Sequence, residues 1–367
     1  MQNSKFFMLS IALFFSVNSY AGGNLEQYYL RAQKATTEVC KANFDKANEM
    51  FKAAFKDYKI AYFTDLNNAL YAAVRAQKVD SAYIKKLFEE IGTRGVVIRT
   101  RYGKRPAYTP FVNLMVSGNS DSLPAKDLTA LNLVNDAILR DQAVRGISGK
   151  LSQPTFYTQD ITILPAVRAV DSVNFEVVCG VLRAALKKKE NLESTVGYQA
   201  VESIFTILWH CSPWGYSNKE LLDSCVALGV VYAPSVANAF DHFCGGGSYL
   251  NVASNWPKEQ NCDKVFALYG GSVTVQFTKS CYIFMLQDSI LNIVNNRRKQ
   301  LFLGDVYEQA KIVAYAFLFS SEGFVYPGVQ SIPDRDFEDS YEQILKDKGI
   351  KYILYRGKED FDYNRKW

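Results

Sequence analysis

The sequence lacks the motifs that mark several common enzyme and metalloprotein classes. It contains two histidines in 367 residues and no paired C-x-x-C elements, so a structural zinc site is not expected. It has no G-x-G-x-x-G loop, no G-x-x-x-x-G-K-[ST] loop and no H-E-x-x-H motif. These absences argue against dinucleotide binding, P-loop nucleotide binding and zinc proteolysis. We expect neither a bound metal nor a cofactor.

A concentrated basic segment and a long apolar run are also missing. Lys and Arg number 42 and Asp and Glu number 37, which gives a net charge of +5, and the charges are interspersed along the chain. Nucleic-acid-binding proteins usually gather basic residues on one face, so nucleic acid is not an expected partner. Beyond the first residues no stretch reaches the apolar length of a membrane helix. We therefore expect no membrane span in the mature chain.

Residues 1–21 have the pattern of a signal peptide. Lys5 supplies a positive charge, "FFMLSIALFFSV" is a short apolar run, and the small residues Ser19 and Ala21 precede the expected cleavage point. We expect a mature protein that is secreted or periplasmic. In such an oxidising compartment the seven cysteines are allowed to form disulfides. Five of them fall between residues 211 and 281, so a bridge within that segment is predicted as possible, with the pairing left open.

The remaining chain is predicted to be a mainly α protein. Hydrophobic residues make up 48% and charged residues 22%, as in globular proteins, and the length leaves room for about two domains. Residues 22–95 contain three clear amphipathic segments with aromatic and alanine residues at helical spacing. They resemble tetratricopeptide-type helical hairpins, although an ordinary helical bundle explains them equally well.

Local signals suggest where these N-terminal helices begin and end. Thr64 or Asp65 is a candidate N-cap for one helix, and Asp80 is a candidate N-cap for the next. Gly92 is expected to end that second helix in a left-handed conformation.

Residues 96–124 are rich in Gly, Pro and Ser, so we assign them to a connection with a short strand at "VVIRT". Residues 125–310 are predicted to form a second helical domain. Residues 311–367 are predicted to be a C-terminal extension that adds a helix and a strand at "KYILYRG".

Several polar side chains occupy helix positions where apolar residues are expected. In "PAKDLTALNLVNDAILRDQAVR" the apolar stripe continues to Gln142 and Arg145, and Asp141 is the nearest acidic residue. In "DSILNIVNNRRKQLFLGD" Arg298 takes such a position. A buried arginine requires a partner because an unpaired buried charge is costly. The alternatives are that the first helix emerges into water and that Arg298 extends its charged end to the surface.

The segment "AVESIFTILWHCSPWG" places His210 on a polar stripe with Gln199, Ser203 and Thr206. If that stripe faces a pocket, His210 is a candidate acid/base. The alternative is structural, because an imidazole in the last turn of a helix interacts favourably with the helix dipole.

Residues 136–310 resemble an uncharacterised bacterial exported domain family of unknown function, often preceded by tetratricopeptide-like helices. The resemblance is carried, in order, by "DQAVR", "DSVNFEVVCGVLR", "STVGYQAVESIFTILWHCSP", "APSVANAFDHF", "ALYGG" and "NNRRKQLFLGDVYEQAK". The chain departs from the family pattern at His242, at Gly271-Ser272 and before Val196. The resemblance adds Asn174, Asp241 and Tyr269 to the candidate site residues.

Two functions are compatible with these patterns. The first is a protein- or peptide-binding module that uses the N-terminal helices as a groove. The alternative is a hydrolase-like enzyme with a polar pocket. In that pocket the hypothetical catalytic residues are His210, Asp241, Asp141 and Tyr269, and the hypothetical ligand-binding residues are Gln142, Arg145, Asn174 and Arg298.

Overall fold

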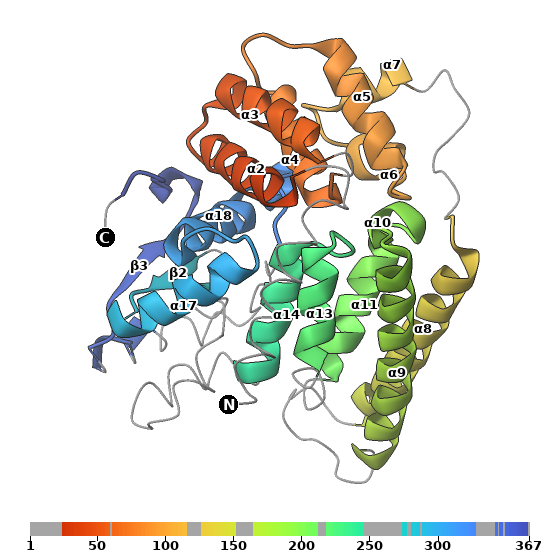
Figure 1. Ribbon diagram of the computed structural model, residues 1–367. Helices are drawn as coiled ribbons and strands as arrows, with labels where there is room; N and C mark the ends of the chain where they lie inside the picture. The colour runs from red at the N-terminus through yellow and green to blue at the C-terminus, as the bar shows by residue number, and fades with distance from the viewer. Residues whose placement is uncertain are drawn as a thin grey trace, which may run out of the picture.

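The protein is mainly helical, as the sequence predicts, with one small antiparallel sheet in its C-terminal part (Figure 1). The computed structural model describes residues 24–58, 61–115, 126–151, 164–211, 218–245, 274–276, 280–286, 288–327, 342–343, 345–347 and 349–365. The predicted signal peptide lies outside these residues.

Four N-terminal helices pack in sequence order, each against the next. They are α2 (Leu25–Cys40), α3 (Phe44–Asp57), α4 (Phe63–Ala73) and α5 (Ser81–Gly92). The Asn24 side chain caps α2, and the Asp80 side chain caps α5 as predicted by accepting the Tyr83 N–H at 3.0 Å. The buried face of α3 carries Phe51, as its helical spacing predicts.

Two predictions about the ends of these helices are wrong. Helix α4 begins at Phe63, so Thr64 and Asp65 lie in its first turn and are buried instead of capping it. The left-handed glycine after α5 is Gly95, with φ of 72°, because Thr93 continues the right-handed conformation beyond Gly92.

The predicted strand at "VVIRT" is also wrong, because Ile98–Tyr102 forms the short helix α6, followed by α7 (Thr109–Met115). In this helix Tyr102 is fully buried, packs edge-on against Phe88 and donates a hydrogen bond to Asn67 at 2.7 Å. These tertiary contacts outweigh the strand preference of the β-branched residues.

The central part is a helical bundle, drawn in yellow to green in Figure 1. Its helices are α8 (Leu128–Leu151), α9 (Leu164–Lys188), α10 (Leu192–Thr195), α11 (Tyr198–His210), α13 (Lys219–Ala227) and α14 (Ala233–Gly245). Helix α11 packs against α8, α9 and α14, so it lies at the centre of this bundle.

The C-terminal part combines helices with the sheet. Its elements are β1 (Thr274–Gln276), β2 (Cys281–Phe284), α17 (Asp288–Gln300), α18 (Val306–Phe319), the 3-10 turn η3 (Ser320–Glu322), β3 (Tyr352–Tyr355) and the turn η4 (Lys358–Asp360). The strands pair antiparallel in the order β1-β2-β3, and Tyr282 lies opposite Val275 on one side and Leu354 on the other.

The strand predicted at "KYILYRG" is confirmed as β3. The boundary predicted at residue 310 falls inside α18, which packs on β1, β2 and α17 and also contacts α2. The segment after residue 310 is therefore integrated with the sheet and with the preceding helix.

Buried polar groups join the N-terminal helices to the central bundle. The Asp65 carboxylate on α4 accepts hydrogen bonds from Tyr28 at 2.6 Å and from Tyr232, just before α14, at 2.9 Å. The Glu193 carboxylate on α10 accepts the backbone N–H of Phe63, at the N-terminus of α4. Burial raises the pKa of Asp65 to about 6 and that of Glu193 to about 8.

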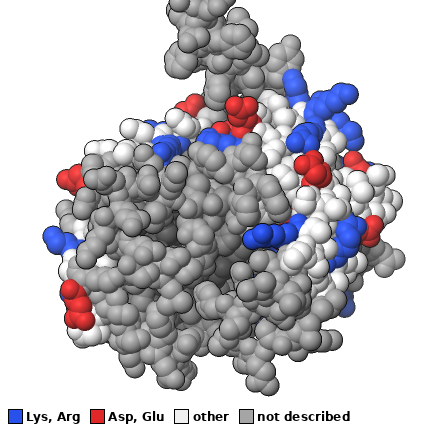
Figure 2. Space-filling model, turned by 90° about the horizontal axis from the view of Figure 1, so that it is seen from below, with Lys and Arg blue, Asp and Glu red and all other residues white. Residues whose placement is uncertain are grey.

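Charges of both signs share the described surface. Figure 2 shows the molecule from below, with Lys and Arg side chains beside Asp and Glu side chains along the margin of the view. Some charged residues of the described surface form ion pairs, such as Arg31 and Asp57, whose side chains approach to 2.9 Å. No described helix is long and apolar enough to cross a membrane.

The described cysteines are buried free thiols: Cys40, Cys179, Cys211, Cys225 and Cys281. Three of them belong to the segment in which a disulfide was predicted as possible, and none of those three is bridged. Cys262, and the side chain of Cys244, lie outside the described residues.

Candidate functional site

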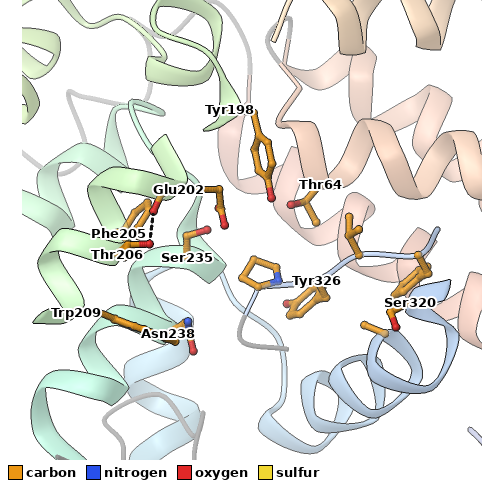
Figure 3. A pocket seen from close by; sticks show the side chains of 14 residues that line it. Thr64, Tyr198, Glu202, Phe205, Thr206, Trp209, Ser235, Asn238, Ser320 and Tyr326 are labelled. Atoms are coloured by element: carbon orange, nitrogen blue, oxygen red, sulfur yellow. Dashed lines mark hydrogen bonds between the residues drawn. The ribbon is translucent and has the colours of Figure 1, made fainter. Parts of the chain in front are cut away.

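A cavity of about 320 Å³ lies where the N-terminal helices, the central bundle and the C-terminal part meet (Figure 3). It is lined by Thr64, Tyr198, Glu202, Phe205, Thr206, Trp209, Ser235, Asn238, Ala316, Ser320, Phe324, Val325, Tyr326 and Pro327. Because these residues come from α4, α11, α14, α18, η3 and the segment after η3, the cavity exists only in the assembled fold.

Helix α11 forms one wall of the cavity with a single face. Glu202, Phe205, Thr206 and Trp209 are spaced by three and four residues, which brings them to one side of a helix. The helix follows Gly197, whose φ of 92° disfavours any residue with a Cβ atom. Its first N–H, on Tyr198, donates to the carbonyl of Arg94 at 2.8 Å, which attaches α11 to the chain that follows α5.

The opposite wall is an irregular segment that α4 holds in place. Asn68 donates from Nδ2 to the Val325 carbonyl at 2.9 Å and accepts the Val325 N–H at Oδ1 at 3.2 Å. The neighbouring Asn67 donates to the carbonyl of Gly323 at 2.8 Å. These bonds satisfy the backbone of a segment with no strand partner there, so Val325 and Tyr326 keep a defined place at the cavity.

Glu202 supplies the charge at the cavity. Among the described residues that line it, the other ionisable side chains are tyrosines. In Figure 3 its carboxylate points into the space between α11, α14 and the segment of Tyr326. The side chain is accessible to solvent, yet surrounding protein raises its pKa above the ordinary value, and the positive charge of Arg101 and the Tyr198 hydroxyl lower it by less. This combination is typical of a carboxylate in a concave site.

A second polar cluster joins α8, α9 and α11 and contains several of the residues predicted from the sequence. The Nδ1 atom of His210 lies 2.9 Å and 3.0 Å from the two carboxylate oxygens of Asp141, whose side chain is 1% exposed. Arg145 places one guanidinium nitrogen 2.8 Å from Asp141 and donates with the other to both oxygens of Asp171, at 2.9 and 3.2 Å. Burial raises the pKa of Asp171, although the charge of Arg145 opposes this.

The other predicted residues near this cluster are Gln142 and Asn174. Gln142 donates to Asp141 at 2.8 Å, and Asn174, which is fully buried, accepts from Arg140 at 3.1 Å. Within the described part of the chain, the Nδ2 atom of Asn174 has no hydrogen-bond partner. Gln142, Arg145 and His210 thus all contact Asp141, and the roles predicted for these residues stay a prediction.

Arg298 does not join that cluster. It lies on α17, is fully buried, and donates to the carbonyl of Gly304 at 2.6 Å and to the side chain of Gln309. It therefore holds the turn between α17 and α18, and the alternative that it extends its charged end to the surface is wrong. Its assignment as a ligand-binding residue stays a prediction. Tyr269, and the side chain of Asp241, lie outside the described residues.

None of the predicted site residues that the structure describes lines the cavity, although both sites use α11. Of the polar stripe assigned to this helix, Thr206 faces the cavity and His210 faces Asp141, while Gln199 is exposed. Glu202 and Trp209 were not predicted from the sequence. The available signal was a charged residue followed by aromatic residues three and seven positions later on one face.

No protein-family model, no curated protein and no solved structure matches this chain. The resemblance to an uncharacterised exported family therefore stays a prediction. In the described residues, no three His, Cys, Asp or Glu side chains are grouped so as to hold a metal ion.

Proposed function

We propose that the protein is an exported binding module that receives a peptide side chain in the cavity between α11, α14 and the segment of Tyr326. The observation that carries this proposal is the cavity itself, about 320 Å³ in volume, with aromatic, hydroxyl and amide groups on its walls. Ligand sites are usually concave, largely apolar and furnished with a few polar groups that fix orientation. The cavity is concave and has such polar groups on its walls, and its lining is more polar than that of a typical site.

The size of the cavity favours a segment of peptide over a folded partner as its direct occupant. A volume of about 300 Å³ is at the lower end of the range for small-ligand sites and accommodates one or two side chains. The walls are preformed, because Asn68 fixes the Val325 backbone and Tyr198 fixes the start of α11. Preformed walls reduce the entropy lost on binding. This places the proposed site at the junction of three parts of the chain, away from a groove on the N-terminal helices alone.

The test is a synthetic array of pentapeptides whose central residue is varied through the natural amino acids, probed with the labelled mature protein. Peptides that bind are then measured by isothermal titration calorimetry. We expect Ser235→Trp, which places an indole in the cavity, to reduce binding at least about tenfold by steric exclusion. Asn238→Trp, one turn further along α14, should act in the same way.

Ser203→Trp is the matched control, because Ser203 lies on α11 but does not line the cavity. Thermal unfolding of all three variants shows whether the fold is retained. The proposal fails if no peptide in the array binds, or if both cavity-filling variants fold and bind as well as the wild type.

A second candidate is a hydrolase-like enzyme in which His210 acts as acid or base. It is favoured by the contact between His210 and Asp141. A carboxylate accepts hydrogen bonds, so this geometry places a ring proton on Nδ1 and leaves Nε2 as the acceptor. We expect any hydrolysis of chromogenic ester or phosphoester substrates to fall at least about a hundredfold in His210→Gln. Activity that survives this substitution contradicts the assignment.

A further inference from the structure

We propose that the occupant of the cavity carries a primary alkylammonium group, as in a lysine side chain, and that Glu202 binds it. This inference rests on the proposed function and names the chemistry of its ligand. Two sources share that chemistry, a lysine within a peptide and a free alkylamine, and the experiment below separates them.

The charge of the lining is the first argument. Apart from tyrosine hydroxyls, Glu202 is the ionisable group among the described residues that line the cavity, so the site is complementary to a cation. The surrounding protein disfavours its ionised form, as its raised pKa shows. A cation beside the carboxylate would compensate part of this cost by direct attraction between two opposite charges at short distance.

One described arginine, Arg101, acts electrostatically on Glu202 without lining the cavity. The Arg101 guanidinium lies over the ring of Phe63, 4.6 Å from its centroid, and 5.9 Å from that of Tyr198. Its charge lowers the pKa of Glu202, but burial raises that pKa by more. Arg101 is not among the residues that line the cavity, so the cavity volume remains available beside the carboxylate.

The other walls suit an ammonium group on an aliphatic stem. Ser235 and Asn238 on α14 present a hydroxyl and an amide oxygen as acceptors, and an ammonium group has three N–H donors to direct at them and at Glu202. Trp209 and Tyr326 present aromatic surface against which methylene groups pack and toward which a cation is attracted. In Figure 3 the side chains of Glu202 and Ser235 lie next to each other, above both rings in this view.

The experiment compares matched ligands by calorimetry with the full mature chain. The ligands are a pentapeptide with a central lysine, the same peptide with Nε-acetyllysine or arginine, and n-pentylamine. We expect the lysine peptide to bind at least about tenfold more tightly than the acetyllysine peptide, because acetylation removes the charge. We also expect Glu202→Gln to remove this preference while leaving the acetyllysine peptide unaffected.

Glu89→Gln is the control for the change in net charge, since Glu89 is an exposed residue of α5 outside the cavity. It should retain the preference for lysine. Binding of n-pentylamine as tight as that of the peptide would assign the free amine as the source. Binding of the lysine peptide that is tighter than binding of n-pentylamine would assign a peptide lysine as the source of the ammonium group.

The inference is overturned if lysine and acetyllysine peptides bind equally, if arginine binds more tightly than lysine, or if Glu202→Gln keeps the preference. In each of these cases the proposed function still stands if Ser235→Trp blocks the binding of the peptides. Absence of binding by every peptide contradicts the function itself.

Discussion

Glu193 is a buried carboxylate whose ionisation should oppose folding. It is 4% exposed and accepts the N–H of Phe63 at the start of α4. Burial raises its pKa from 4.5 to about 8, while the Phe63 N–H and the charge of Arg94 oppose that shift. In the unfolded chain the group ionises near its ordinary pKa. Folding above that pH must therefore either take up a proton or bury a charge.

The magnitude follows from the pKa difference of about 3.5 units, at about 1.36 kcal/mol per unit. Below pH 4.5 both states are protonated and there is no cost. The folded pKa is the higher one, so stability falls by about 1.4 kcal/mol per pH unit between roughly pH 4.5 and pH 8 and then levels off. The cost is about 1 kcal/mol at pH 5 and about 5 kcal/mol at pH 9.

The substitution Glu193→Gln removes this titration while keeping an oxygen that can accept the Phe63 N–H. The free energy of unfolding is measured in urea for both proteins at pH 5 and at pH 9. We expect the difference between variant and wild type to shift by about 4 kcal/mol in favour of the variant from pH 5 to pH 9. Any constant cost of placing an amide there cancels in this difference. Glu190→Gln, at an exposed neighbouring position, should leave the pH dependence unchanged. Parallel pH profiles for wild type and Glu193→Gln would refute the reasoning.

Two further comparisons use matched pairs of substitutions, assayed by thermal and urea unfolding. Gly180→Ala, in α9 with nothing near the added Cβ, should stabilise the protein by about 0.5–1 kcal/mol. Gly229→Ala should destabilise it by about 1–3 kcal/mol, because Gly229 has φ of 69° and the added Cβ would clash with the Tyr58 hydroxyl. Equal stability of the two variants would contradict this expectation. Asp141→Asn should destabilise by about 1–3 kcal/mol, because a charge that contacts both α8 and α11 partners is lost. Asp136→Asn, exposed on the same helix, should change little, and a similar loss in both variants would argue against a role for the buried cluster.

The sequence was most informative where one helix carried the whole signal. The hydrophobic spacing and the Asp80 cap predicted α5, and the position of Arg145 on an apolar stripe predicted that it would need a partner if it were buried. The predicted neighbour Asp141 and the more distant Asp171 both supply one. Periodicity predicts such contacts because it fixes which side of a helix each residue occupies.

The sequence was least informative where the outcome depended on distant segments. Arg298 also sits on an apolar stripe, but its partners are a turn carbonyl and Gln309, which periodicity does not reveal. The strand expected at residues 96–100 is partly replaced by a helix because Tyr102 is buried against Phe88. The cavity was not predicted, since its walls at Thr64 and Tyr326 are brought together only by the tertiary fold.

Helix α11 contributes to both polar sites, the cavity with Glu202 and the cluster in which His210 contacts Asp141. Its first turn is attached to the Arg94 carbonyl, and its last turn is held by the contact of His210 with Asp141. The face between these attachments carries Glu202 and Trp209 into the cavity. With both ends fixed, the orientation of that face is fixed as well, since a helix rotates as a unit. Substitutions in the Asp141 cluster should therefore weaken ligand binding by loosening this wall, whereas substitution of Glu202 should alter which ligands bind.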